Sequence, residues 1–462
     1  MLRNDISRRT HLMMYGACLL PMIPFLATGP ASAAPPHPFP VLATPEQLAA
    51  ETLLLRLLEE PEVKAAMSRA EAELSRDPIA QTIDGKARLP NFIRQITTNL
   101  MLNEYVGDVH HPGFIWASDD TPHFWFGREV PGSAMANDNP DQIYRQSYID
   151  GRFHYRVSGK LNIARRPAQL SFSIIKGWQA GVPFPQEKGK VFLGNQYATR
   201  SLEDLKVGAD GSFEFTLGPD RNPRDATHVT LEPGPFIVLV RDVLSDWQHQ
   251  MPPRLSIRRT DRVTAPPRSD AEIRSSILTH LHDYAVFWGT YSHRFVGGLA
   301  ANAIAGPFAR EGGIGYFALA RFHLEPGQVA VITIGRGGAA YSGVLGMDPW
   351  MVTFDGRTSL ASLNNTQSIP NPDGSFTYVA SPTDPGVANW IDTSGLHDGF
   401  LCARWLGFPK GHGPDGLLKN FSIVSLADLT AGALAQIPRT TPAARRAQLE
   451  QRGKDYHRRL EQ

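Results

Sequence analysis

The stretch richest in chemically distinct side chains is the loop of residues 384–395, where amide, indole, carboxylate and hydroxyl groups lie between Pro and Gly turns. Loops supported by a rigid sheet often carry functional sites. Asp392 and His397 lie close enough in sequence to act as an acid–base pair. The alternative is structural, with Asp392 and Thr393 bonding their own backbone in a turn and Trp390 filling a core.

Further side chains suited to ligand binding flank this loop. Amides provide hydrogen bonds, and indole rings provide apolar faces on which a ligand can stack. The predicted ligand-binding residues are Asn364, Gln367, Asn389, Trp390 and Trp405, and the candidate catalytic residues are Asp392, His397 and Arg404. They predict a pocket in the second β-rich segment for a small or saccharide-like molecule. A non-enzymatic interaction module of the cell envelope is the alternative function.

Motifs of other chemistries are missing from the sequence. It contains no Gly-x-Ser-x-Gly elbow, no His-Glu-x-x-His pair and no Gly-x-x-x-x-Gly-Lys phosphate loop. His110, His111 and His123 lie near Asp108, but they lack the spacing of a ligand motif. The segment is interpreted as a loop that packs aromatic residues, with a metal site as the alternative. No metal or cofactor is predicted.

Composition limits the class of protein. The chain has 462 residues, 42% hydrophobic and 20% charged, which is typical of a globular protein. Its net charge of +1 gives no indication of binding to nucleic acid or to an anionic membrane. With 37 Pro and 41 Gly, the chain needs many turns, which favours a mainly β structure over a helical bundle.

Residues 1–33 are predicted to be an export signal of the twin-arginine type. Arg8 and Arg9 precede an apolar run, and Ala33 ends a small-residue cleavage site. An ordinary secretory signal is the alternative. Either predicts a soluble protein in the periplasm or outside the cell, with no membrane span. Without Cys18, which lies in the signal, only Cys402 is left, and a buried inert thiol is expected there.

Local patterns divide the remaining chain into helical and β-rich segments. Helix starts are predicted at Thr44-Pro45, at Pro90, at the Ser269–Glu272 capping box and at Thr441-Pro442. Residues 213–217 alternate as in a strand, and residues 236–240 are a fully apolar run typical of a buried strand. The predicted segments are a helical region (34–106), a first β-rich domain (107–262), a helical connector (263–310), a second β-rich domain (311–424) and a helical tail (425–462).

Two parts of the chain share a layout that predicts an internal repeat. Asp210-Gly211-Ser212-Phe213 recurs as Asp373-Gly374-Ser375-Phe376, and an apolar run ending in arginine follows each copy. The separation from Asp210 to Arg241 is 31 residues, and that from Asp373 to Arg404 is also 31. Two related β-domains joined by a helix are therefore expected.

Several motifs resemble a bacterial family catalogued as domain of unknown function 1214. They are Asn139-Pro140-Asp141 with Tyr144, the strand from Tyr155 to Gly159, Ser359-Leu360 to Asn364 with Gln367, and the run from Asp384 through Asn389-Trp390-x-Asp392-Thr393 to Arg404-Trp405. The resemblance covers roughly residues 137–405. It implies β-sandwich domains of jelly-roll type and no particular activity, so the expected fold is mainly β with helical additions.

Overall fold

Helices α1 and α4 begin where local signals place them. The Thr44 hydroxyl accepts a hydrogen bond from the Gln47 backbone at the start of α1. Ser269 and Glu272 form the capping box that opens α4. The α-helices are α1 (Pro45–Leu57), α2 (Pro61–Leu74), α3 (Ile83–Tyr105), α4 (Asp270–Gly289), α5 (Tyr291–Phe295) and α6 (Pro442–Arg458). Short 3-10 turns are η1 (Pro78–Gln81), η2 (Ile163–Arg165), η3 (Leu202–Asp204), η4 (Glu311–Gly313), η5 (Ala427–Thr430) and η6 (Gly432–Gln436).

The start of α3 differs from the prediction. The helix begins at Ile83, capped by the Thr82 hydroxyl, and Pro90 lies inside it. Proline is most favourable in a first turn, so the sequence alone pointed to a start at Pro90. Tertiary packing outweighs this preference, because the buried face of α3 extends from Leu89 through Phe92 to Leu100.

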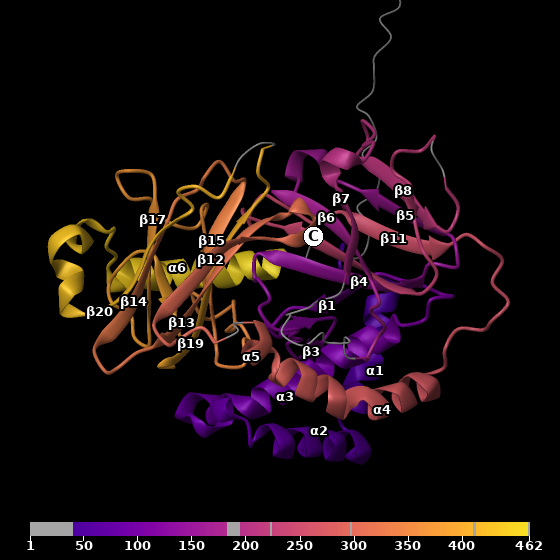
Figure 1. Cartoon of the computed structure of the whole chain (residues 1–462), viewed down its shortest axis with the longest axis horizontal. Helices are drawn as coiled ribbons and strands as arrows, with labels where there is room; N and C mark the ends of the chain where they lie inside the picture. Colours follow the sequence, from indigo (N-terminus) through magenta and orange to yellow (C-terminus); the bar gives the residue numbers. More distant parts are fainter. Residues whose placement is uncertain (1–39, 183–194, 222–223, 296–297, 410–412, 461–462) are drawn as a thin grey trace, which may run out of the picture. The chain divides into compact units, whose positions relative to one another are not determined.

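The structure is a computed structural model that describes residues 40–182, 195–221, 224–295, 298–409 and 413–460. All of them belong to a single compact unit, and the predicted signal, residues 1–33, lies outside them. Helices α1 to α4 lie together, with α4 packed on α2 and α3 (Figure 1). In the part of the chain that is described, no helix is long and apolar enough to cross a bilayer.

The first half of the β structure consists of two sheets. The five-stranded sheet has the order β1-β4-β10-β6-β7, and the four-stranded sheet has the order β11-β5-β8-β9. The strands are β1 (Ile115–Ser118), β4 (Gln142–Asp150), β5 (Tyr155–Lys160), β6 (Gln169–Lys176), β7 (Asn195–Ser201), β8 (Ser212–Gly218), β9 (Val229–Thr230), β10 (Pro235–Val243) and β11 (Arg254–Arg259). A small hairpin of β2 (His123–Trp125) and β3 (Arg128–Val130) lies outside these sheets.

The second half also has a five-stranded and a four-stranded sheet. Their orders are β12-β13-β19-β15-β16 and β18-β17-β14-β20. The strands are β12 (Ala303–Ala309), β13 (Gly315–His323), β14 (Gln328–Ile334), β15 (Tyr341–Met347), β16 (Ser362–Asn364), β17 (Phe376–Ser381), β18 (Trp390–Asp392), β19 (Asp398–Leu406) and β20 (Leu418–Ser425). Strand β12 lies within residues 263–310, the segment predicted as a helical connector.

The two halves have the same topology. Strands β4, β10 and β6 occupy the positions in the first half that β13, β19 and β15 occupy in the second. Both four-stranded sheets contain one parallel pair, β8 with β9 and β17 with β18. The matching orders agree with the predicted repeat and confirm a mainly β fold with helical additions. Arg241 on β10 and Arg404 on β19 therefore occupy equivalent positions.

Side chains along β10 and β19 point alternately to the two faces of their sheets, and each face belongs to a different core. Phe236 and Val238 point into the core of the first sandwich, and Leu401 and Ala403 point into that of the second. The opposite faces of both strands contribute to a central core shared with α3 and α4, through residues such as Ile237 and Cys402. The outer faces of the two five-stranded sheets thus pack toward one another and toward the helices. We call this region the joint.

Helix α6 contacts both halves. Arg452 donates from Nε to Gly356 O at 2.8 Å, and Arg459 donates to Pro140 O. The Trp247 ring lies beside both guanidinium groups, at 4.6 Å from that of Arg452 and 4.5 Å from that of Arg459. The predicted helix start at Thr441-Pro442 is confirmed.

Candidate functional site

The loop of residues 384–395 is tied closely to its own sheet. The Asn389 amide donates to Ile369 O at 2.8 Å and to Thr377 O at 3.1 Å, and its oxygen accepts from the Ile369 backbone at 2.9 Å. Trp390 is buried in the second sandwich and donates to Ser381 O. These contacts use the polar groups that a ligand would need, so the geometry favours the structural interpretation of both residues.

Asp392 and His397 bond to different groups. The Asp392 carboxylate accepts from Ser394 N at 2.7 Å, as in a turn, and burial raises its pKa above the ordinary value. The His397 Nδ1 lies 2.7 Å from Leu324 O. No hydrogen bond joins the two side chains among the described residues, so the structure does not bring the proposed acid–base pair together.

The other predicted ligand-binding residues are divided between core and surface. Trp405 is completely buried and donates to Gly335 O at 2.7 Å. Asn364 is also buried and donates to Asp141 Oδ1 at 3.0 Å. Gln367 does line a cavity of about 390 Å³, shared with Trp247. Trp247 is 2% exposed, so its ring gives a ligand little surface on which to stack.

The three histidines considered for a metal site have separate partners. His111 bonds Asp108 at 3.0 Å, His110 bonds Arg259, and His123 bonds Glu51 at 3.3 Å. Within the described ranges, no group of three or more His, Cys, Asp or Glu side chains is arranged to hold a metal ion.

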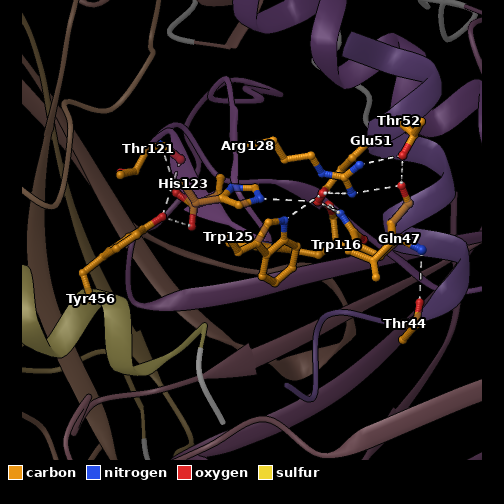
Figure 2. Close-up of polar contacts among 12 residues, drawn as sticks. Thr44, Gln47, Glu51, Thr52, Trp116, Thr121, His123, Trp125, Arg128 and Tyr456 are labelled. Carbon is orange, nitrogen blue, oxygen red and sulfur yellow. Dashed lines mark hydrogen bonds and ion pairs between the residues drawn. The ribbon is translucent and has the colours of Figure 1, made fainter. Parts of the chain in front are cut away.

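The bond from His123 belongs to a closed cluster around Glu51, shown in Figure 2. The side chain of Glu51 on α1 is fully buried. Its Oε1 accepts from Gln47 at 2.9 Å and lies near His123, and its Oε2 accepts from Trp125 at 2.8 Å and from Arg128 at 3.2 Å. With both oxygens doubly engaged, this carboxylate fixes α1 against the β2–β3 hairpin and has no lone pair left for a ligand.

A second Glu–His pair lies at an open cavity. The cavity has a volume of about 760 Å³, within the range of small-molecule sites, and its lining comes from α3, α4, β4 and the segments that follow β6 and precede β10. Glu104 on α3 and His280 on α4 both line it, with His280 Nδ1 at 2.8 Å from Glu104 Oε1. The Glu104 side chain is 2% exposed and that of His280 is 27% exposed.

This arrangement determines which nitrogen of His280 can react. An ionised carboxylate at Nδ1 favours the tautomer with its proton on Nδ1 and its lone pair on Nε2. No group of the described residues is hydrogen-bonded to Nε2. Ser276 Oγ lies 3.3 Å from Nδ1, the nitrogen already engaged by Glu104, so the three residues do not form a Ser-His-Glu triad.

Two donors complete the polar wall of the cavity. Arg268 reaches Glu104 Oε2 at 3.3 Å from both terminal nitrogens. Tyr148 on β4 is 3% exposed, and its pKa is raised well above 10 by burial and by the nearby Tyr284 and Glu104. The Tyr148 hydroxyl therefore stays protonated at neutral pH and can donate a hydrogen bond. Trp178 supplies an apolar wall beside Trp288.

The backbone at Gly181 lies against the Glu–His pair. Its φ is 68°, in the left-handed region. A Cβ at this position would lie 2.1 Å from Glu104 Oε1 and 2.7 Å from His280 Nδ1. Only glycine permits this approach. The pair is thus held by two helices and covered on one side by the loop after β6.

Sequence reasoning did not identify this site. Glu104 and His280 are 176 residues apart and lie on helices that carry no chemical motif. The buried face of α4 was recognisable from its apolar spacing, but nothing in that pattern shows which other helix its polar residues meet. The resemblance also implied no activity.

Comparisons with known proteins support the fold alone. No family model matches the chain, and no curated protein matches it. An uncharacterised protein from Burkholderia cenocepacia has a similar structure, with a TM-score of 0.62 and 23% sequence identity over 81% of this chain and 100% of that one. The VPA0106 protein from Vibrio parahaemolyticus is a weaker match, with a TM-score of 0.37 and 9% identity over 63% of this chain and 90% of that one.

Proposed function

We propose that the protein binds a small polar molecule in the 760 Å³ cavity and that His280 Nε2 accepts a proton from it. The observation that carries the proposal is the 2.8 Å bond between Glu104 and His280 at the wall of this cavity. A buried carboxylate orients the imidazole and stabilises the imidazolium formed by proton transfer. The proposal places the pocket beside the helices and the first half, whereas the sequence pointed to the second half.

The lining defines the class of ligand. Val109, Trp178 and Pro235 form apolar surface, while Tyr148 offers a donor and His280 an acceptor. A molecule with a compact carbon skeleton and hydroxyl or carbonyl groups fits this mixture, and saccharide-like compounds belong to this class. The Tyr148 hydroxyl would donate to an oxygen on which negative charge develops as the proton leaves.

Export is a further part of the proposal. The arginine pair at residues 8 and 9, the apolar run and the small-residue site support delivery to the periplasm or the cell exterior. We also propose membership of the family catalogued as domain of unknown function 1214, on the motifs between residues 137 and 405. A test of export is fractionation of cells that express the full chain, compared with an Arg8→Lys/Arg9→Lys variant, which should stay in the cytoplasm.

A thermal-shift screen tests the binding site. Sugars, hydroxy acids, keto acids and aromatic acids are offered to the wild-type protein and to His280→Gln. A compound that binds the folded state raises the unfolding midpoint by linkage. The matched control is His282→Gln, because His282 lies on the same helix but bonds Glu73 and Asp283 at the surface.

We expect at least one compound to raise the unfolding midpoint of the wild-type protein. This rise should be smaller in His280→Gln and unchanged in His282→Gln. A hit that survives both substitutions would place the ligand elsewhere. If no compound stabilises the well-folded wild-type protein, a non-enzymatic envelope module becomes the better interpretation.

A further inference from the structure

The equivalent arginines of the two halves meet at the joint. Arg241 on β10 is directly opposite Tyr144 on β4 in the sheet register. Arg404 on β19 crosses from the other half to donate to the Tyr144 hydroxyl at 3.1 Å. The same tyrosine therefore lies beside one arginine and bonds the other. The repeat has brought two guanidinium groups to one place.

A third arginine, Arg310, lies at the end of the β12–β13 hairpin, and its charge interacts with those of Arg404 and Arg241. Arg310 closes this hairpin, donating from its backbone to Gly315 O at 2.8 Å. The tip of the hairpin lies against β7 of the first half, where a Cβ on Gly312 would be 2.1 Å from Thr199 Oγ1. Burial and the positive charges of Arg404 and Arg241 lower the pKa of Arg310 to about 9.

The acceptors around these arginines are neutral. Arg404 bonds the Asn137 side chain at 2.9 Å and Tyr144, and Arg241 bonds Ser173 Oγ at 2.8 Å. Among the described residues, no carboxylate oxygen lies within 4.0 Å of the three guanidinium groups, and no acceptor is bonded to that of Arg310. Within the part of the chain that the structure describes, Arg241 Nε and the Oγ of Ser171, which is opposite Arg241 in the sheet register, are buried without a hydrogen-bond partner.

Carboxyl groups nearby offset little of this charge. Asp138 is an acidic side chain that interacts electrostatically with Arg241 and Arg404. Burial raises the pKa of Asp138 to about 7, and its carboxyl group accepts a hydrogen bond from Met135 N at 2.7 Å. Much of the Asp138 population is therefore protonated at neutral pH. Charges withdrawn from water without a counter-ion are costly, and an anion would remove that cost.

We propose that Arg241, Arg310 and Arg404 form a binding site for a small oxyanion, a carboxylate or a phosphate-like group, at the joint between the two halves. The guanidinium fork matches the geometry of both groups, and Ser171 Oγ can donate to either. The ligand would make its strongest bonds to Arg310 and Arg241, whose donors are incompletely used. Arg404, whose donors are engaged with Asn137, Tyr144 and Cys402, would supply mainly charge.

This site is separate from the proposed proton-transfer site. Tyr144 and Tyr148 lie on the same face of β4, four residues apart, which corresponds to about 13 Å along a strand. Tyr144 lies at the joint, where it bonds Arg404, and Tyr148 lines the cavity with His280. A His280→Gln variant should therefore retain the response to anions, and failure of one proposal leaves the other to be judged on its own result.

The experiment measures unfolding midpoints of the full chain in millimolar sodium phosphate, sodium sulfate or sodium acetate, each against sodium chloride at equal ionic strength. The test variant is Arg310→Gln, because this side chain is half-buried and no described residue accepts from its guanidinium. The control is Arg258→Gln, an exposed arginine on β11. At higher salt, phosphate and sulfate stabilise many proteins without binding, so low concentrations and paired variants are needed.

We expect at least one oxyanion to stabilise both the wild-type protein and Arg258→Gln. Arg310→Gln should bind that oxyanion with an apparent Kd on the order of tenfold higher. In chloride alone, Arg310→Gln should unfold at the same or a higher temperature than wild type, because it relieves repulsion. A response to acetate alone indicates a carboxylate ligand, and one to phosphate or sulfate alone a tetrahedral oxyanion. Oxyanions that stabilise wild type no more than chloride does, or stabilise Arg310→Gln equally, would overturn the proposal.

Discussion

Two buried Glu–His pairs lie in the same helical layer and differ in how completely their polar groups are engaged. Glu51 on α1 is enclosed by four donors, and the His123 ring stacks on Trp116 with centroids 4.9 Å apart. Glu104 on α3 has fewer partners, and the Nε2 atom of His280 has no hydrogen-bond partner among the described residues, at the wall of a cavity. A buried Glu–His pair is therefore no sign of a site by itself. The second pair differs from the first because His280 lines a cavity in which a ligand could reach its Nε2 atom.

The largest expected effect is on the closed cluster. Glu51→Gln removes the charge that compensates Arg128 and leaves donors of Gln47, His123 and Trp125 competing for one oxygen. Breaking a buried ionic network typically costs about 3–5 kcal/mol of unfolding free energy. Urea unfolding of the variant should show this loss, with ligand binding retained in whatever protein stays folded.

The same substitution at the open pair should cost less. Glu104→Gln also breaks bonds to Arg268 and His280, but these partners are 26% and 27% exposed and can turn toward water. A Glu104→Gln variant as unstable as Glu51→Gln would show that the open pair is as structural as the closed one.

The next effect concerns the backbone that covers the open pair. Gly181→Ala places a methyl group against Glu104 and His280 in a left-handed conformation, so we expect a cost of about 1–2 kcal/mol and loss of any cavity ligand. Gly313→Ala is the matched control, since its φ is 70° and no atom lies within 4 Å of the added carbon. The control should show the backbone cost and normal binding. Equal binding by both variants would contradict the role given to the loop.

The last prediction concerns the carboxyl group of Asp138 at the joint. The pKa of Asp138 is raised from 3.8 to about 7, so the folded protein binds a proton that the unfolded chain releases. This contribution is complete below about pH 4 and is lost as the pH rises through about 7, with a slope near 1.4 kcal/mol per pH unit.

Urea unfolding between about pH 5 and pH 7 should therefore show a shallower fall in stability for Asp138→Asn than for wild type. If Asp138→Asn leaves the pH slope unchanged, Asp138 is ionised in the folded protein. The joint would then carry a negative charge close to the arginines.

Local signals predicted much of the fold. Thr44, Ser269 and Thr441 each satisfy backbone donors of the helix they start, so the relevant interaction spans only three residues. The apolar run 236–240 forms the buried strand β10 as expected. The repeat was visible because both copies preserve the same spacing between a turn and a strand end.

The candidate site could not be predicted in the same way. The crowding of polar residues in 384–395 has the same appearance whether they bind a ligand or close a turn, and Asn389 and Asp392 do the latter. Glu104 and His280 meet only because α3 and α4 pack together, which no local pattern encodes. Arg404 was predicted as a catalytic residue beside Asp392 and His397 and as an equivalent position of the repeat, and in the structure it bonds Tyr144 and Asn137.

The docking of α6 has a consequence for motion. Arg452 is bonded to the second half and Arg459 to the first, with the Trp247 ring beside both, so a hinge-like separation of the halves would have to break these bonds together. Ligand exchange is therefore expected to depend on local fluctuations at the cavity rim, and the halves should move as one rigid body during binding.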